Sequence, residues 1–289
     1  MTHTSLLVIV NQAKDEEDAV LQAEQKLEHY SCYREVEPRV VGFLSFGSYY
    51  DTLKVIQNFE NEEYAKISFE NPESREAEIL SEELGEEIRI IDDKYVRVST
   101  YNQEARWDWY ELGGRWEGFI PSKLSFKGVN VCRKQDMDID GAKRIALSKA
   151  LAEYEKYEEV TKSLVPGPSF EEVLEGIPQD LPDVSRNRAA GAQYRQDPWV
   201  KAVSAMVGTF SLNAHSYFFV GDGEKEAYLE NATNGFMSPF ALLTGEDEWF
   251  ETGRGYLTAS SSAEWNTLFA EQVEHAEEES WFLIYDLHI

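Results

Sequence analysis

Apolar runs occur at both ends of the chain, and they predict strands that are buried on both faces. Leu6–Val10 is a continuous run of five apolar residues, and Trp281–Ile289 is nearly as apolar throughout. A strand covered on one face alternates apolar and polar residues, whereas a continuous run indicates cover on both faces. A terminal segment this apolar is normally paired within a sheet. We therefore expect the N- and C-terminal strands to share one sheet.

The interior of the chain mixes helical and strand patterns. The clearest helix is Ile139–Leu164, where apolar residues recur at three- and four-residue steps and form one stripe. A second amphipathic helix is predicted at Ala263–Ala276. Short strands are predicted at 39–46, 88–91, 95–100, 209–212, 217–220, 239–243 and 249–251. Together these elements predict an α+β fold, with packed helices on a mixed or antiparallel sheet.

Two segments of unusual composition bear on the domain organisation. Residues of about 50–90 form an acidic insertion, with helices predicted at 49–60 and 71–84. Residues of about 166–182 are rich in proline and glycine, which is typical of a connection. Because strands from both ends of the chain are expected in the same sheet, we predict one α+β unit over residues 1–289.

The net charge excludes one large class of function. The chain has 54 acidic and 27 basic side chains among 289 residues, a formal net charge of −27. A field of this sign repels phosphate backbones, so direct nucleic-acid binding is not expected. The acidic excess is concentrated in the first and last thirds of the chain. An anionic ligand or partner is therefore best accommodated by the middle third.

Neither a targeting segment nor a membrane span is recognisable. The first residues lack a basic region, and no run approaches the roughly 20 apolar residues that span a bilayer. Cys32 and Cys132 are far apart and form no CxxC motif. We expect two unrelated free thiols rather than a disulfide or a metal site. These features predict a cytoplasmic protein without a membrane partner.

The most specific local motif is a ten-residue aromatic block that ends in Gly-Gly-Arg-Trp. Paired glycines permit a turn with positive φ or the close approach of another group. An arginine framed by aromatic rings suits anions and nucleobases. The alternative is that the aromatic residues are core and the glycines a hairpin turn. The candidate ligand- or partner-binding residues are Trp107, Asp108, Trp109, Tyr110, Gly113, Gly114, Arg115 and Trp116.

This block resembles a sequence feature of an uncharacterised family encoded largely by tailed bacteriophages and prophages. Members open with Met-Ser-His before an apolar strand, carry a WDWYxxGGRW block and end in an acid-x-His-Ile strand. The present chain shows His3 before Leu6–Val10, the block at 107–116, and Asp286-Leu287-His288-Ile289. The resemblance implies a phage or prophage origin and the host cytoplasm as location, but the family has no established activity.

A second group of candidate residues lies at the two ends of the chain. If the terminal strands are neighbours, His3, Asp286 and His288 can converge, because residues two apart share a strand face. Two imidazoles and a carboxylate suit a metal site, or acid–base catalysis on a phosphodiester assisted by Arg115. The alternative is that both histidines only make hydrogen bonds at strand ends. No known catalytic motif is present, so an enzyme is not favoured and no metal or cofactor is predicted.

The acidic run Asp136–Gly141 matches only the first half of an EF-hand calcium loop. The glutamate that should close the loop would fall at Leu147, inside the predicted helix. We therefore expect these acids to cap the helix that begins near Ile139.

Three functional hypotheses remain. The first is a phage accessory protein that binds and inhibits a host protein, for example in antiviral defence, or sequesters a small nucleotide-like ligand. The second is a small hydrolase or phosphoesterase that uses His3, Asp286 and His288. The third is an acidic mimic of DNA, which requires carboxylates at phosphate-like spacing. Missing catalytic motifs and the surface charge favour the first hypothesis.

Overall fold

A computed structural model describes residues 3–43, 77–78, 80–82, 84–92, 94–207, 214–218, 224–252 and 259–288. The chain divides into two compact units, one made of Met1–Lys26 and Trp109–Ile289 (unit 1) and the other of Leu27–Asp108 (unit 2). Most of the predicted acidic insertion, including the helix expected at 49–60, lies outside the described residues. The strand expected at 209–212 lies outside them as well.

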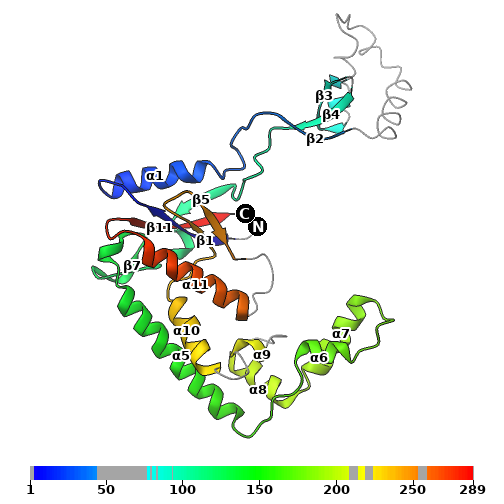
Figure 1. Cartoon of the computed structure of the whole chain (residues 1–289), viewed down its shortest axis with the longest axis vertical. Helices are drawn as coiled ribbons and strands as arrows, with labels where there is room; N and C mark the ends of the chain where they lie inside the picture. Colours follow the sequence, from blue (N-terminus) through cyan, green and yellow to red (C-terminus); the bar gives the residue numbers. More distant parts are fainter. Residues whose placement is uncertain are drawn as a thin grey trace, which may run out of the picture. The chain divides into compact units, whose positions relative to one another are not determined.

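Unit 1 is built around a mixed sheet in which the two terminal strands are neighbours (Figure 1). β1 and β11 pair antiparallel over eight residues, from His3 opposite His288 to Val10 opposite Trp281. β9 runs parallel to β1, and β5 and β8 both pair with β11. The α+β prediction, with both ends of the chain in one sheet, is confirmed. The strands are β1 (His3–Val10), β5 (Trp109–Leu112), β8 (Val131–Arg133), β9 (Ala241–Leu243), β10 (Trp249–Glu251) and β11 (Trp281–His288).

Helices cover both faces of this sheet, as the continuous apolar runs predict. Figure 1 shows α1 (Glu16–Glu28) on one side of the paired terminal strands and α11 (Ala259–His275) on the other. On the α11 side, Ile284 of β11 belongs to a buried cluster that includes Phe269 of α11. Every residue of β11 from Trp281 to Leu287 is buried. The strand is therefore buried up to its last residue, His288, which is only partly buried.

The rest of unit 1 is mainly helical and has a second, aromatic core. Helix α5 provides Tyr154 and Tyr157, which pack with Trp199 and Phe218. The remaining elements are η1 (Gly114–Trp116), β6 (Ile120–Ser122), β7 (Ser125–Val129), η2 (Lys134–Asp136), α5 (Ile139–Thr161), α6 (Phe170–Glu175), α7 (Asp183–Tyr194), α8 (Pro198–Val207), α9 (Ala214–Tyr217) and α10 (Glu224–Asn234).

Two predictions made from local sequence patterns can be compared with the structure of this region. The carboxylate of Asp138 accepts a hydrogen bond from the backbone N–H of Gly141 at 3.0 Å, so its predicted capping role is confirmed. The strand predicted at 217–220 is wrong at its first residue, because Tyr217 ends helix α9. A short apolar run does not distinguish a strand from a buried helical turn, and here the run supplies Phe218 to the aromatic core.

Unit 2 contains a smaller antiparallel sheet of order β2-β4-β3, made of β2 (Arg39–Phe43), β4 (Lys94–Ser99) and β3 (Glu87–Ile91). Its core cluster contains Ala77, Leu80 and Ile88. Within the described ranges of both units, no helix has the length and apolar character needed to cross a membrane.

Candidate functional site

The antiparallel register of β1 and β11 brings the three predicted catalytic residues together. His3 lies directly opposite His288, and their rings are 5.3 Å apart in an edge-to-face arrangement. The Nδ1 atom of His3 lies 3.1 Å from Oδ1 of Asp286 and 3.2 Å from Oδ2. The structure therefore places two imidazoles and one carboxylate at the end of the sheet where the hydrophobic cover stops. Their catalytic role stays a prediction.

Asp286 is the buried member of this group, with 2% of its surface exposed. A carboxylate removed from water requires compensating donors. It receives them from the His3 ring and from the backbone N–H of Arg115, which lies 3.2 Å from Oδ2. The other nitrogen of the His3 ring, Nε2, is not used by this carboxylate. His3 is thus held in a fixed orientation by a charge-assisted hydrogen bond.

The paired glycines make the contact between Arg115 and Asp286 geometrically feasible. Gly113 and Gly114 have φ values of +76° and +50°, in the left-handed region that favours glycine. A Cβ atom on Gly114 would lie 2.5 Å from Cβ of Asp286 and 2.9 Å from Oδ2. The Gly-Gly motif therefore serves both purposes inferred from the sequence, the positive-φ turn and the close approach of another group.

An exposed aromatic ring lies beside the histidine pair, and an exposed cation follows the Gly-Gly turn whose backbone contacts Asp286. Trp109 pairs with His288 in the sheet, and its indole lies 6.3 Å from the His3 ring. This tryptophan is 46% exposed, which is unusual for so large an apolar side chain. The Arg115 side chain is exposed as well and makes no hydrogen bond or ion pair with the described part of the chain. Both groups are available to a ligand.

The remaining residues of the aromatic block lie elsewhere. Trp107 and Asp108 belong to unit 2, where the buried indole of Trp107 donates a hydrogen bond to the carbonyl of Leu27 at 3.1 Å. Tyr110 packs edge-to-face on Tyr285, which lies on the sheet face opposite Asp286. Trp116 packs on Phe119 at the edge of the core. For Trp107, Tyr110 and Trp116 the structural alternative describes the placement better than ligand binding does, and the binding role of Asp108 stays a prediction.

Sequence reasoning missed two polar residues at this end of the sheet. Glu111 lies opposite Asp286 and is exposed, while Ser5 lies opposite Asp286 on the other side and is buried. The Ser5 hydroxyl accepts a hydrogen bond from the backbone N–H of Phe240 at 2.9 Å. Glu111 lies two residues from Trp109, and Ser5 lies two residues from His3. Because alternate residues share a strand face, this spacing could have identified both of them.

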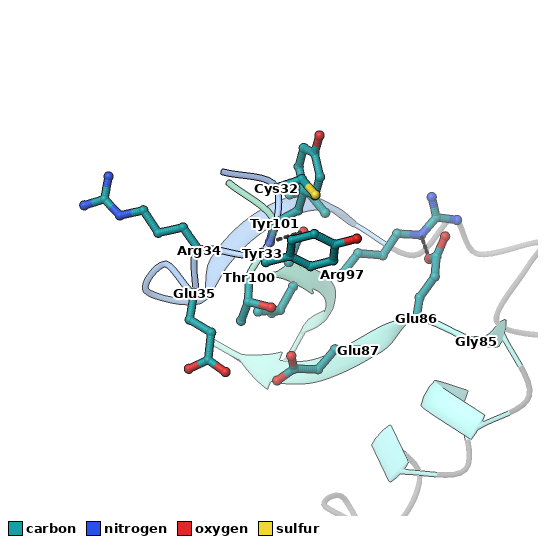
Figure 2. Close-up of a pocket in the computed structure, with 13 residues that line it drawn as sticks. Cys32, Tyr33, Arg34, Glu35, Gly85, Glu86, Glu87, Arg97, Thr100 and Tyr101 are labelled. Carbon is teal, nitrogen blue, oxygen red and sulfur yellow. Dashed lines mark hydrogen bonds and ion pairs between the residues drawn. The ribbon is translucent and has the colours of Figure 1, made fainter. Parts of the chain in front are cut away.

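A cavity lies within unit 2, and its lining differs chemically from the histidine site (Figure 2). It has a volume of about 630 Å³ and is lined by residues that include Tyr33 and Tyr101. Among the described residues that line it, Arg97 pairs with Glu86 at 2.9 Å and Arg34 contacts His29. Because its cations already have partners, this cavity is the weaker candidate for an anionic ligand.

Metal binding is not supported by the arrangement of ligating side chains. Among the residues that the structure describes, no group of three or more His, Cys, Asp or Glu side chains is placed to hold a metal ion. The side chains of the histidine site can take part in hydrogen bonding, ion pairing, stacking and proton transfer. In comparisons with protein-family models, curated protein sequences and solved structures, nothing matches this chain.

Proposed function

We propose that unit 1 binds a small anionic ligand with an aromatic ring, such as a nucleotide, on the surface formed by His3, His288, Trp109 and Arg115. The observation that carries this proposal is the pair of opposed histidine rings beside an exposed indole. Imidazole N–H groups and a guanidinium are the donors that proteins use for phosphate. The face of an exposed indole stacks on a nucleobase, which contributes about 1–3 kcal/mol per base.

The charge distribution supports a small ligand over a long polyanion. Asp286 is compensated by His3 and by the backbone N–H of Arg115, so its charge is offset within the site. Exposed Glu111 beside it accepts hydrogen bonds from hydroxyl groups, as a sugar would offer. Beyond the site, the net charge of −27 repels an extended phosphate chain. A mononucleotide contacts only the local surface and avoids most of that repulsion.

This activity corresponds to sequestration by a phage accessory protein, the first of the three hypotheses. Sequestration requires capture without turnover. The missing catalytic motifs and the exposed position of Trp109 support capture. Inhibition of a host protein remains compatible with the same chain but has no comparable support at this site.

Calorimetric titration with AMP, GMP, UMP and inorganic phosphate tests the proposal. We expect at least one nucleotide to bind, and we expect Trp109→Ala and Arg115→Ala each to weaken binding about 10-fold, as loss of a stacking or ion-pair contact does. Because both side chains are exposed, the melting temperature should change little. Arg188→Ala, at another exposed arginine, is the matched control. Failure of every nucleotide to bind, or binding indifferent to both substitutions, would contradict the proposal.

A second function, phosphoester hydrolysis, is favoured by one specific contact. The hydrogen bond between His3 Nδ1 and Asp286 leaves Nε2 to accept a proton from water while His288 donates one to the leaving oxygen. Phosphorus NMR of 2′,3′-cyclic AMP incubated with the protein detects such turnover. We expect His3→Asn to abolish it, because asparagine can keep the donor to Asp286 but lacks the second ring nitrogen. An unchanged rate in this variant, or binding without product, excludes the hydrolase.

A further inference from the structure

A second surface of unit 1 exposes apolar side chains around the β6–β7 hairpin. Leu124 at its turn is 82% exposed, and Phe126 in β7 is fully exposed. Ile145, on the second turn of α5, is 58% exposed. Isolated exposed apolar residues are ordinary, but three such residues around one pocket mark an interaction site. We call this group, with its pocket, the hairpin surface.

The pocket lies between the hairpin and the first turns of α5. It has a volume of about 300 Å³, and its lining includes Leu124, Phe126, Ala142 and Ile145. Ala142 and Ile145 share a helix face with Asp138, because they follow it by four and seven residues. The carboxylate of Asp138 also lines the pocket, but it is occupied as the cap of α5. The space is therefore suited to one bulky apolar side chain.

The charge of the hairpin surface is opposite to that of the chain as a whole. Segments 120–129 and 138–150 together contain five cationic side chains and two acids, Asp138 and Asp140, whereas the whole chain carries −27. Lys127, Arg144 and Lys149 are exposed, and their side chains make no hydrogen bond or ion pair with the described residues. The three cations belong to β7 and α5, the two elements that border the pocket.

We propose that the hairpin surface binds an acidic peptide segment of a partner protein, with one bulky apolar residue in the pocket and carboxylates on Lys127, Arg144 and Lys149. A short peptide contacts the local patch, and charges more than about 10 Å away are screened at 0.1 M salt. An anionic bilayer is extended and faces the acidic remainder of the molecule. A second copy also brings a net charge of −27. Both are repelled more strongly than a peptide.

The hairpin also offers backbone groups to an extended peptide. β6 and β7 form a two-stranded sheet, and β7 pairs with no other strand in the part of the chain that the structure describes. An open strand edge presents N–H and C=O groups that a peptide can use by strand addition. Backbone pairing along β7 would place alternate side chains of the peptide beside Phe126.

A selection from a displayed library of random 12-residue peptides on the full-length chain, followed by binding measurements with synthetic peptides, tests this proposal. We expect enriched sequences to combine several acids with one aromatic or large aliphatic residue. Phe126→Ser should weaken their binding about 10-fold or more, as truncation of a central apolar anchor does. The double variant Lys127→Glu, Arg144→Glu should weaken it similarly, and most strongly at low salt. Val184→Ser, at an exposed valine of α7, is the matched control and should have no effect.

Three outcomes overturn the proposal. The first is that no acidic peptides are enriched, or that those enriched bind Phe126→Ser as well as the native chain. The second is Phe126-dependent binding to phosphatidylserine vesicles without peptide binding, which identifies a lipid surface. The third is a dimer in sedimentation experiments that Phe126→Ser dissociates, which identifies a second copy. Because Phe126 is fully exposed, the variant is expected to fold, and its melting temperature checks this.

Discussion

The sheets of the two units are built on different burial patterns. In unit 1, β11 is buried from Trp281 to Leu287, and helices lie on both sides of it (Figure 1). In unit 2, buried Ile88 of β3 is flanked by the exposed residues Glu87 and Arg89. The first pattern requires cover on two faces and the second on one. A polar residue therefore has a different meaning in each sheet: it is unusual in the strand covered on both faces and ordinary in the strand covered on one.

In a strand covered on both faces, any polar residue is costly and needs a partner. Asp286 is such a residue, and it has one hydrogen bond from His3 and one from the Arg115 backbone. In β3, by contrast, Glu87 and Arg89 form a surface ion pair with each other at 2.5 Å. Exposed pairs of this kind contribute little, about 0–1 kcal/mol. In the sheet of unit 1, which is covered on both faces, a buried polar residue therefore indicates a candidate site.

The largest expected difference between the two sheets concerns their cores. Ile284→Ala should lower the free energy of unfolding by about 2–5 kcal/mol, because it leaves a cavity in a large, closely packed cluster. Ile88→Ala is the chemically matched change in unit 2 and should cost less, since its cluster holds fewer buried side chains among the residues that the structure describes. Urea unfolding followed by circular dichroism measures both losses. Equal losses would show that the two cores are packed equally well.

A second comparison uses two glycines with similar backbone angles. Gly114 has φ +50° and Gly85 has φ +65°, so alanine is strained by about 1–2 kcal/mol at either position. At Gly114 the new Cβ meets the Asp286 side chain at 2.5 Å, whereas at Gly85 no atom of the described residues lies within 4 Å of it. Gly114→Ala should therefore cost about 1–3 kcal/mol more than Gly85→Ala.

Thermal melts of the two glycine variants, with nucleotide binding as the second readout, check this expectation. Gly114→Ala should also reduce nucleotide binding, because it displaces Asp286 and with it His3. Gly85→Ala should leave binding intact. Equal melting temperatures for the two variants would contradict the close approach at Gly114.

The sequence predicted the central sheet well because its signal is local and strong. Continuous apolar runs at both ends indicated buried strands, and pairing of those strands followed from the need to cover them. The convergence of His3, Asp286 and His288 followed in turn from two-residue spacing on a shared face. Each step needed only periodicity and the assumption of neighbouring strands.

The division of the aromatic block could not be predicted in the same way. Trp107 and Trp109 are two residues apart and identical in type, yet one is buried in unit 2 and the other is exposed beside His3. The boundary between units falls between them, and no change of composition marks it. The roles of Ser5 and Glu111 depend on strand register, which pairing fixes and a single sequence does not show.

A smaller effect on the free energy of unfolding, specific to the sheet of unit 1, should appear at high pH. Burial raises the pKa of Tyr285, so the folded state keeps its phenolic proton above pH 10, where an unfolded tyrosine releases it. Stability is therefore complete below about pH 10 and falls above it by about 1.4 kcal/mol per pH unit for one such group. Tyr285→Phe should remove this part of the alkaline loss.

The same variant has an informative result at neutral pH. The hydroxyl of Tyr285 is buried, and no group of the described part of the chain makes a hydrogen bond with it. Its removal should leave stability unchanged or slightly higher, since an unsatisfied buried polar group costs about 1–3 kcal/mol. Urea midpoints at pH 7, 10 and 11 measure both effects. A clear loss at pH 7 would indicate that this hydroxyl has a partner in solution.

The smallest expected effect concerns the two thiols, one in each unit. Cys132 is buried in the main core of unit 1, and burial raises the pKa of its thiol. Cys32 is partly exposed at the cavity of unit 2 (Figure 2). Because the thiolate is the reactive form and must be reached by solvent, iodoacetamide should modify Cys32 first. Peptide mass spectrometry over time measures this order. The singly modified protein should keep its stability within about 0.5 kcal/mol, as surface changes usually do, whereas equally fast modification of Cys132 would show that the core of unit 1 opens readily.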